Sequence, residues 1–407
     1  MIDVVILGST GSIGTQALDV IARCGAPVRV VGLAAGGAQL ELLARQAVDW
    51  QVEYVAIADD TRVADLQLAM AAARARRQHP GPSPEILAGP TAAASLAELV
   101  PSGLVLNGMS GSIGLGPTLA ALRAGAELAL ANKESLVAGA SLVRRAQQRP
   151  GQIRPVDSEH SAMWQALAAG RHRRGLVAEH VDGTSEVARL ILTASGGPFR
   201  GWTRAQLRDV TAAQALQHPT WAMGPVVTIN SSTLMNKALE LIEAHVLFDV
   251  APEQIVPVVH PQSVVHSLVE FIDGSTLAQA SPPDMCLPIA LGLSSPQRWA
   301  GAALPCAWDA PVTWTFAPLD EETFPAVSLA RQAIAASASH PAVLNAANEE
   351  CVAAFLAGRL DYLGIVDIVA DVLAEHQDPG EVSTLADITA IEDGARLRAR
   401  ALISERD

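Results

Sequence analysis

Two carboxylates, Asp157 and Glu159, stand one residue apart in a segment that also carries a histidine and two serines. No further charged side chain follows until Arg171. Carboxylate oxygens suit a hard divalent cation such as Mg²⁺ or Mn²⁺, and two of them leave positions of an octahedral ion open for substrate oxygens. A solvated acidic turn is the common alternative for an isolated pair of this kind. Other segments must therefore decide between the two readings.

A second group of residues that could take part in chemistry lies in segment 229–240. Ser231 to Thr233 can cap a helix whose N-terminal end attracts an anion. Asn236 and Glu240 stand one helical turn apart on one face, and Lys237 borders that face. A phosphate-binding group beside a carboxylate is what a metal-assisted reaction on a phosphorylated substrate needs. An ordinary Lys–Glu pair on a helix is the alternative.

A lysine follows an expected strand that ends near Leu130. Lys133 is then at the carboxyl edge of a sheet, where ligands bind in α/β folds. Its charge could stabilise a developing oxyanion. A solvated lysine at a helix start is the equally plain alternative.

Two loops of the central segment carry weaker signals. Ser195 precedes two glycines and offers a hydroxyl and backbone amides to an anion, although such a sequence is more often only a turn. Segment 218–225 contains His218, Trp221 and Met223 between two prolines. These side chains could form a lid over a small ligand, although tryptophan and methionine usually fill a core.

The elements that must position these residues begin with an apolar run, 3–7, followed by the glycine spacing Gly8-x-x-Gly11-x-x-Gly14 and a helical period. Glycines at such a strand-to-helix turn let the backbone approach a pyrophosphate. A dinucleotide-binding domain is predicted, and a phosphate-binding domain of similar topology is the alternative. A second run of this spacing, 108–114, is interpreted as another tight turn.

Alternating strands and helices continue through the first 150 residues, which predicts a parallel sheet with helices on both faces. The expected strands are 28–33, 54–58, 85–88, 103–106 and 127–130, with a helix over 62–77. Beyond residue 324, helical periods are expected over 327–336, 341–356, 362–373 and 385–403, which predicts a helical bundle.

The end of the second strand usually reports which dinucleotide is bound, and here it reads Gly36-Gly37-Ala38. An Asp or Glu at this point would bind the ribose hydroxyls of NAD, and its absence weighs against NAD. An Arg or Lys would bind the 2′-phosphate of NADP, and its absence leaves that phosphate without an obvious partner.

Composition limits the classes of partner. A chain of 407 residues exceeds one ordinary core, so two or three domains are expected. Half of the residues are hydrophobic and the formal net charge is -14, which argues against nucleic acid and anionic membrane partners. We expect neither a signal peptide nor a membrane-spanning segment, and four scattered cysteines fit a reducing compartment. A soluble cytoplasmic protein is expected.

Seven segments together resemble the 1-deoxy-D-xylulose 5-phosphate reductoisomerase family, in that family's order and over essentially the whole chain. They are GSTGSIG (8–14), LANKESLV (130–137), VDSEHSA (156–162), LTASGGPFR (192–200), HPTWAMG (218–224), NSSTLMNKALELIEA (230–244) and HPQSVVHS (260–267). The resemblance implies an α/β fold in four parts. These are an NADPH-binding Rossmann-like domain (1–156), a central α+β catalytic domain with a flap (157–293), a linker (294–323) and a C-terminal helical bundle (324–407).

The resemblance also implies the site residues. The divalent ion (Mg²⁺, Mn²⁺ or Co²⁺) would be held by Asp157, Glu159 and Glu240. Substrate would contact Lys133, Ser158, Glu159, Ser195, His218, Ser231, Asn236, Lys237 and Glu240. NADPH would contact Thr10, Gly11, Ser12, Ile13, Gly36, Asn132, Glu134 and Gly224. Trp221 and Met223 would close as the flap.

By the same resemblance, the reaction is a retro-aldol cleavage and aldol recombination of 1-deoxy-D-xylulose 5-phosphate. Hydride transfer from NADPH then gives 2-C-methyl-D-erythritol 4-phosphate for isoprenoid synthesis. Lys133, Asp157, Glu159 and Glu240 would be catalytic, and a homodimer is expected. Gly37 and Ala38 stand where many members carry Lys-Asn, which leaves the strictness of the NADPH preference open. The rival hypotheses are an NAD(P)-dependent enzyme for another phosphorylated polyol and a non-catalytic nucleotide-binding protein.

Overall fold

The computed structural model describes residues 1–77, 81–221 and 223–406 and consists of two compact units. The first unit comprises Met1–Ser135, Val143–Ser161 and Asp284–Leu304, and the second comprises Leu136–Leu142, Ala162–Pro283 and Pro305–Asp407. Among the described helices, none is both long and apolar enough to cross a lipid bilayer.

The first unit is built on a seven-stranded sheet in which all neighbouring strands are parallel. Its spatial order is β4-β3-β2-β1-β5-β6-β7. The strands are β1 (Ile2–Leu7), β2 (Val28–Ala35), β3 (Tyr54–Ile57), β4 (Glu85–Ala88), β5 (Leu104–Asn107), β6 (Glu127–Leu130) and β7 (Ile153–Pro155). The parallel sheet predicted from the sequence is thus confirmed, with strand ends within two residues of those expected.

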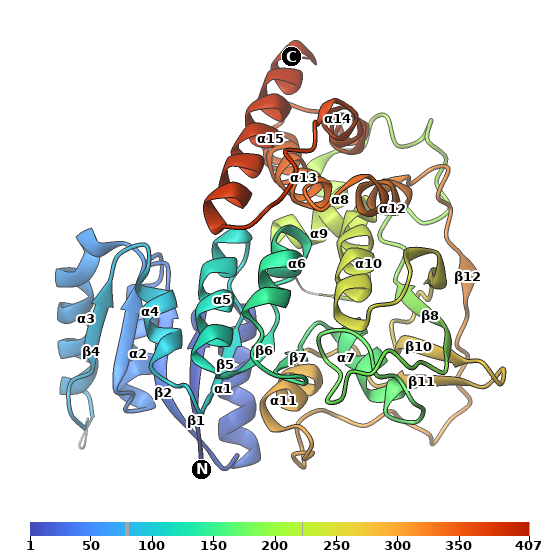
Figure 1. Cartoon of the computed structure of the whole chain (residues 1–407). Coiled ribbons are helices and arrows are strands. Elements are labelled where there is room, and N and C mark those ends of the chain that lie inside the picture. The colour runs from blue at the N-terminus through green and yellow to red at the C-terminus, as the bar shows by residue number, and fades with distance from the viewer. Residues whose placement is uncertain (78–80, 222, 407) are drawn as a thin grey trace. The chain divides into compact units, whose positions relative to one another are not determined.

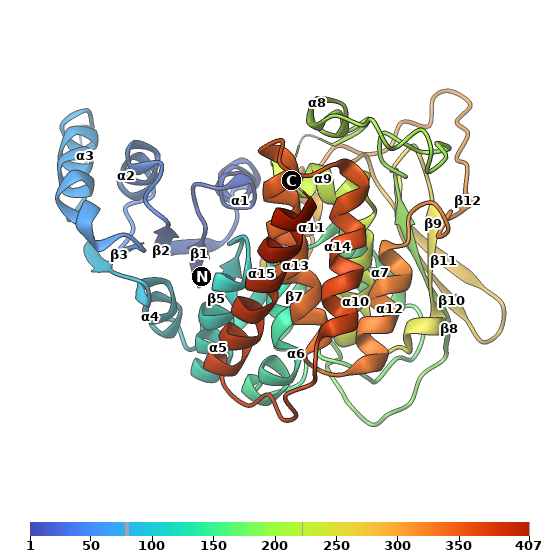
Figure 2. The same cartoon turned by 90° about the horizontal axis from the view of Figure 1, so that it is seen from above.

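Helices cover both faces of this sheet, as Figure 2 shows with α1, α2 and α3 on one side and α4 and α5 on the other. Their bounds are α1 (Ser12–Cys24), α2 (Leu40–Asp49), α3 (Val63–Ala75), α4 (Ala92–Glu98) and α5 (Leu115–Ala124). Because both faces are covered, the central strand β1 reads as a continuous apolar run, and Val4 to Leu7 are fully buried. Helix α11 (Cys286–Ser294) contacts α1 and β6, so Ile289 and Leu293 join the core of the first unit.

Helix α1 illustrates how the sequence fixes an element. Its apolar residues Ala17, Leu18, Val20 and Ile21 recur at helical spacing and are buried. The helix ends at Gly25, whose φ of 55° is in the left-handed region that glycine adopts without steric cost. Helix α6 (Glu134–Ala146) is kinked at Gly139, and helices α6 and α7 (Ser158–Leu167) each contribute residues to both units.

The second unit contains a five-stranded sheet in the order β11-β10-β8-β9-β12. The strands are β8 (Val187–Ala194), β9 (Ile255–Val259), β10 (Val265–Phe271), β11 (Thr276–Ala280) and β12 (Ala317–Pro318). Strands β8 and β9 run parallel, and the other neighbours are antiparallel. The sheet is therefore mixed, and the helices of this unit do not alternate with each strand along the sequence.

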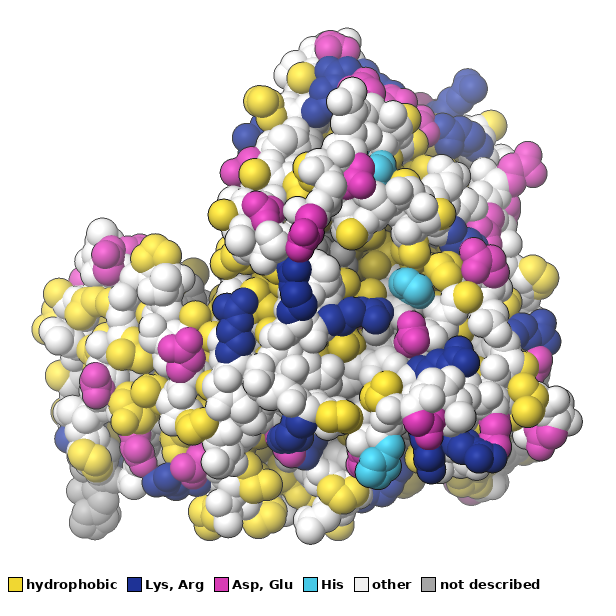
Figure 3. Space-filling model, viewed as in Figure 1, with side chains coloured by type: hydrophobic (Ala, Val, Ile, Leu, Met, Phe, Trp, Pro, Cys, Tyr) yellow, Lys and Arg dark blue, Asp and Glu magenta, His cyan; other side chains and the backbone are white. Residues whose placement is uncertain are grey.

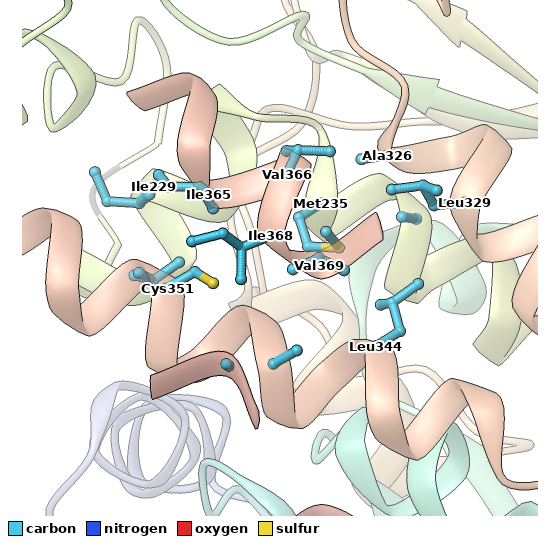
Figure 4. Packing of buried hydrophobic residues seen from close by; sticks show 14 of the residues in the cluster. Ile229, Met235, Ala326, Leu329, Leu344, Cys351, Ile365, Val366, Ile368 and Val369 are labelled. Atoms are coloured by element: carbon cyan, nitrogen blue, oxygen red, sulfur yellow. The ribbon is translucent and has the colours of Figure 1, made fainter. Parts of the chain in front are cut away.

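The helices of the second unit share one large apolar core. They are α8 (Ala212–Ala215), α9 (Pro225–Ser232), α10 (Met235–Phe248), α12 (Ala326–Ala336), α13 (His340–Leu356), α14 (Tyr362–Glu375) and α15 (Leu385–Arg406), and Figure 1 shows the last four together in orange and red. Figure 4 shows Met235 of α10 beside Val369 of α14, with Ile229 of α9 in the same cluster. The C-terminal bundle thus packs directly on the helices that carry the predicted phosphate site.

The outer surface of this bundle is charged with both signs, and Figure 3 shows acidic and basic side chains next to one another around the C-terminal helices. Arg398 forms two hydrogen bonds to Glu375, and Arg400 forms two to Glu350. Exposed pairs of this kind contribute little to stability, so the buried apolar contacts hold the bundle together.

The stretch 305–316 has no helix or strand. Trp308 and Phe316 are largely exposed, although Phe316 stacks on the imidazole of His260 with ring centroids 4.6 Å apart. Thr315 hydrogen-bonds both Gln262 and His260, which anchors this stretch to the mixed sheet.

Candidate active site

The two neighbouring carboxylates lie where strand β7 gives way to helix α7 in the first unit. A bend falls at Asp157, and the helix begins at Ser158. The bend lets Ser158 donate a hydrogen bond from Oγ to Oε2 of Glu159 at 2.5 Å. The Asp157 carbonyl accepts the Ser161 amide at 2.8 Å, which closes the first helical turn. Two hard oxygen donors are thereby held on one short, ordered segment.

Lys133 lies beside this segment. Its Nζ is 2.9 Å from Oδ2 of Asp157, and both side chains are mostly buried, with 17% and 14% of their surface exposed. His160 Nδ1 approaches the same oxygen at 3.8 Å. Lys133 lies between β6 and α6 in the chain. It is therefore at the carboxyl edge of the parallel sheet, as the sequence predicts.

The first glycine turn connects β1 to α1. A Cβ atom at Gly14 would come within 2.4 Å of both Gly8 O and Ser9 Cα, so only glycine allows this close packing. The Gly11 amide donates to Gly8 O at 3.0 Å, and α1 starts at Ser12. Bare backbone amides at the start of a long helix form the geometry that accepts a pyrophosphate, so the turn fits a dinucleotide.

The second glycine turn, 108–114, lies next to the first because β5 is the neighbour of β1. A Cβ at Gly8 would meet Gly108 O at 2.7 Å. The sheet order reverses between β1 and β5, which is where α/β sheets bind ligands. The second turn is therefore a tight strand-to-helix turn at the same crevice, as interpreted from the sequence.

Asn132 and Glu134 hold that second turn in place. The side-chain Nδ2 of Asn132 donates to the carbonyls of Met109 and Gly111 at 3.1 and 2.9 Å and to Glu134 Oε2 at 2.8 Å. Glu134 Oε1 in turn accepts the Gly111 amide at 3.0 Å. Both side chains thus shape the cofactor crevice through the backbone of residues 109–111.

In the second unit, Asn236, Lys237 and Glu240 lie on the first turns of α10. Asn236 and Lys237 both donate hydrogen bonds to the Glu240 carboxylate. Lys237 and Glu240 are almost fully buried, with 5% and 1% of their side-chain surface exposed. A buried carboxylate needs such partners, because an unpaired charge in the interior is costly.

One expectation about this segment is wrong. Ser231 and Ser232 form the C-terminal turn of α9 and do not cap α10. The residue before α10 is Leu234, in the left-handed conformation with φ 62° and without a side-chain cap. Thr233 Oγ1 accepts the Met235 amide at 3.3 Å, which is the nearest equivalent of a cap.

Ser195 and His218 form a defined hydrogen-bonded pair. His218 Nδ1 accepts the amides of Thr220 and Trp221 at 3.1 and 2.8 Å, so this nitrogen carries no proton. The neutral ring then has its proton on Nε2, which donates to Ser195 Oγ at 3.1 Å. Burial lowers the pKa of His218 and favours this neutral form. Since Ser195 Oγ also accepts the Gly197 amide, its own proton can be donated to an anion.

The predicted flap residues lie between α8 and α9. Trp221 is half-buried, and its ring lies edge-on to His266 with centroids 6.1 Å apart. Met223 is also half-buried, Gly224 is the exposed residue before α9, and Ala222 lies outside the described residues.

The predicted residues are divided between the two units. The first unit holds Thr10, Gly11, Ser12, Ile13, Gly36, Asn132, Lys133, Glu134, Asp157, Ser158 and Glu159, and the second holds Ser195, His218, Trp221, Met223, Gly224, Ser231, Asn236, Lys237 and Glu240.

Two contacts were missed by sequence reasoning. Asn348 Nδ2 donates to Asn230 Oδ1 at 2.9 Å, and the Tyr362 hydroxyl donates to the Ser232 carbonyl at 2.7 Å. Both hold the end of α9, next to Ser231. They join residues more than a hundred positions apart. The asparagine repeated in Asn345-Ala-Ala-Asn348 was the only signal in the sequence.

A parallel sheet with a glycine turn that fits a dinucleotide, and a second unit with a buried lysine–carboxylate pair, are typical of a nucleotide-dependent enzyme for phosphorylated substrates. The chain belongs to the 1-deoxy-D-xylulose 5-phosphate reductoisomerase family. The family model for the reductoisomerase matches residues 4–140, and two models for its C-terminal domains match residues 153–248 and 280–398.

Named relatives and solved structures agree with this assignment. The chain is 62% identical to the 1-deoxy-D-xylulose 5-phosphate reductoisomerase of Beutenbergia cavernae, over 99% of this chain and 97% of that protein. It is 57% identical to the reductoisomerase of Kitasatospora griseola, over 98% and 99% of the two chains. The enzyme of Zymomonas mobilis in complex with NADPH superposes with a TM-score of 0.86 at 38% identity, covering 98% of both chains. A reductoisomerase bound to NADPH, fosmidomycin and magnesium gives 0.88 at 34% identity, covering 99% and 98%.

Proposed function

We propose that this chain converts 1-deoxy-D-xylulose 5-phosphate and NADPH into 2-C-methyl-D-erythritol 4-phosphate, a step of isoprenoid biosynthesis. The observation that carries the proposal is that each unit presents a lysine paired with a carboxylate of the predicted cation site, Lys133 with Asp157 and Lys237 with Glu240. High identity over the full length of named reductoisomerases supports it.

Asp157, Glu159 and Glu240 are proposed to ligate one divalent cation, Mg²⁺ or Mn²⁺. Their donor atoms are hard oxygens, which such ions prefer, and a related structure contains magnesium. When bound, the ion supplies the Lewis acidity that polarises the substrate ketone. Ser158 orients Glu159 through its hydrogen bond, and Asn236 orients Glu240.

The substrate phosphate is proposed to bind Ser195, Ser231, Asn236 and Lys237. Ser195 is prepared as a donor because its oxygen already accepts from His218 and from Gly197. Lys237 supplies a positive charge from a buried position, where its attraction to an anion is screened less than in water.

Lys133 and Glu159 are proposed to manage charge and protons at the reacting carbons. Lys133 Nζ lies next to Asp157, and its ammonium can stabilise an oxyanion that develops during carbon–carbon cleavage and recombination. Ser158 is proposed to contact the substrate hydroxyls. Trp221 and Met223 are proposed to close over the substrate and exclude water from the branched aldehyde.

NADPH is proposed to supply the hydride that reduces the aldehyde. Its pyrophosphate would lie on the glycine turn of residues 10–13, whose close packing at Gly14 admits only bare backbone. Gly36, Asn132, Glu134 and Gly224 complete the proposed cofactor contacts.

The finer organisation of the molecule is also proposed on the family resemblance. The four parts 1–156, 157–293, 294–323 and 324–407, a homodimer and a cytoplasmic location remain predictions. Light scattering on the purified chain measures the oligomeric state directly.

The decisive test of activity is NADPH oxidation with 1-deoxy-D-xylulose 5-phosphate after chelation and after addition of Mg²⁺ or Mn²⁺. Metal-dependent turnover to the branched polyol phosphate is expected. Turnover only with another phosphorylated polyol would favour the alternative oxidoreductase. Dinucleotide binding by the folded protein without turnover of any substrate would leave the binding-protein hypothesis.

A further inference from the structure

The loop that follows β2 carries no basic side chain, yet a dinucleotide with a 2′-phosphate needs one near this point. Gly36 has open space where a side chain would begin, with no heavy atom within 4 Å of an added Cβ. Gly37 has φ 111°, a conformation that disfavours any other residue. The backbone here is therefore exposed for a ligand but brings no charge of its own.

An arginine from the neighbouring strand's loop reaches this backbone. Strand β3 pairs with β2 so that Ile57 lies opposite Ala35, and the 3₁₀ turn Asp60–Arg62 follows β3. Arg62 Nη1 donates to the Gly37 carbonyl at 2.8 Å. Its guanidinium thus lies at the carboxyl edge of the sheet, directly beside the loop that in this fold faces the adenosine ribose.

The guanidinium keeps donors for an anion. Its Nε lies 3.5 Å from Asp65 Oδ2, and 40% of the side chain is exposed. Within the described parts of the chain, Nη2 has no hydrogen-bond partner. A guanidinium has five N–H donors in a planar fork that matches a phosphate.

No other basic residue of this region is as well placed. Between residues 28 and 62 the remaining arginines are Arg29 and Arg45. Arg29 is at the opposite end of β2 and is paired with Asp3 and Glu53. Arg45 lies in the second turn of α2, beyond the loop.

An acidic residue, Asp59, also lies near Gly37 and could in principle bind a ribose hydroxyl instead. An added Cβ at Gly37 would be 3.5 Å from Asp59 Cβ. Asp59 Oδ1, however, accepts hydrogen bonds from Thr61 N and Oγ1 at 3.1 and 2.5 Å. Asp59 therefore caps the short turn that carries Arg62. This structural role accounts for the position of Asp59 without a bound ribose.

We propose that Arg62 binds the 2′-phosphate of NADPH and is the residue that makes this chain select NADPH over NADH. This inference rests on the proposed function and extends it to the specificity of the cofactor site. In this arrangement, the loop after β2 provides the backbone surface next to the adenosine ribose. The turn after β3 provides the positive charge of Arg62.

The test is calorimetric titration of the full-length protein with NADP⁺ and with NAD⁺, without metal or substrate. Arg62→Gln is expected to raise the dissociation constant for NADP⁺ by about tenfold or more, the effect of losing hydrogen bonds to a charged group, and to leave that for NAD⁺ unchanged. Arg62→Lys should lose part of the effect, because it keeps the charge without the fork. Arg74→Gln is the matched control, since Arg74 also donates to two backbone carbonyls of the same unit, those of Gly81 and Pro82.

The outcomes separate the hypotheses. Equal weakening of both dinucleotides by Arg62→Gln would mean that the arginine only shapes the Gly37 loop, and would overturn the proposal. Unchanged NADP⁺ binding would overturn it as well. A wild-type protein that binds neither dinucleotide would instead contradict the proposed function itself.

Discussion

The two units each contain one lysine–carboxylate pair, and the pairs differ in their surroundings. Lys133 and Asp157 retain 17% and 14% of their side-chain exposure, whereas Lys237 and Glu240 retain 5% and 1%. Both pairs are mostly buried, but the second is the more deeply buried of the two. Removing one partner of a deeply buried pair strands the other charge in a low-dielectric interior. We therefore regard the first pair as the more adjustable half of the proposed site and the second pair as the more fixed half.

The largest effect is expected from Glu240→Gln. The substitution removes a proposed cation ligand and also leaves Lys237 without its carboxylate. Metal-dependent turnover should fall by at least about a hundredfold. Steady-state kinetics at saturating Mg²⁺ measures it, with the exposed Glu253→Gln in the same unit as control. Wild-type turnover in Glu240→Gln would remove this residue from the site.

The next effect compares the stability of the two pairs. Lys237→Met leaves Glu240 buried and without its lysine, and should lower the free energy of unfolding by about 3–5 kcal/mol. Lys133→Met should cost less, about 1–3 kcal/mol, because its side chain and that of Asp157 are less deeply buried than those of Lys237 and Glu240. Urea denaturation followed by circular dichroism measures both. Equal losses would break the distinction between adjustable and fixed halves.

A smaller effect concerns the support of the fixed half. Asn348→Ala leaves Asn230 Oδ1 without its buried donor and should cost about 1–3 kcal/mol in stability. Because Asn230 precedes Ser231, we also expect a higher KM for the phosphorylated substrate with kcat little changed. Asn345→Ala on the same helix is the control, since Asn345 bonds Glu349 instead. A purely structural role of Asn348 would change stability and leave KM unaltered.

The smallest effect is the pH dependence at His218. Burial lowers its pKa in the folded state, so the unfolded chain takes up its proton first as the pH falls. The stabilising contribution is fully present above the ordinary histidine pKa of about 6.5 and is lost as the pH falls towards the lowered, folded-state value. Nitrogen-15 NMR of the imidazole should show a neutral ring protonated on Nε2 at neutral pH. A proton on Nδ1 would contradict the hydrogen bonds from Thr220 and Trp221.

The local parts of this architecture could be predicted from the sequence because they depend on neighbouring residues. Gly8 to Gly14 lies between an apolar run and a helical period, so the strand, turn and helix follow directly. Helices α12 to α15 begin and end within three residues of the predicted bounds, because proline, glycine and periodicity mark them.

The remaining features depend on pairings between distant residues. Asn348 meets Asn230 only because α13 packs on α9. Arg62 meets Gly37 only because β3 lies beside β2 in the sheet. The expected cap at Ser231 to Thr233 was wrong because Leu234 takes a left-handed conformation and separates two helices. Side-chain preference alone cannot report such a break, since leucine rarely adopts it.

We propose that Asp157, Glu159 and Glu240 hold one divalent cation, and this proposal can be tested directly. Electron paramagnetic resonance of Mn²⁺ titrated into the full-length protein measures the number of bound ions and their affinity. We expect one ion per chain and a clear loss of affinity in each of Asp157→Asn, Glu159→Gln and Glu240→Gln. Wild-type affinity in any one of these variants, from a folded protein, would contradict the proposal.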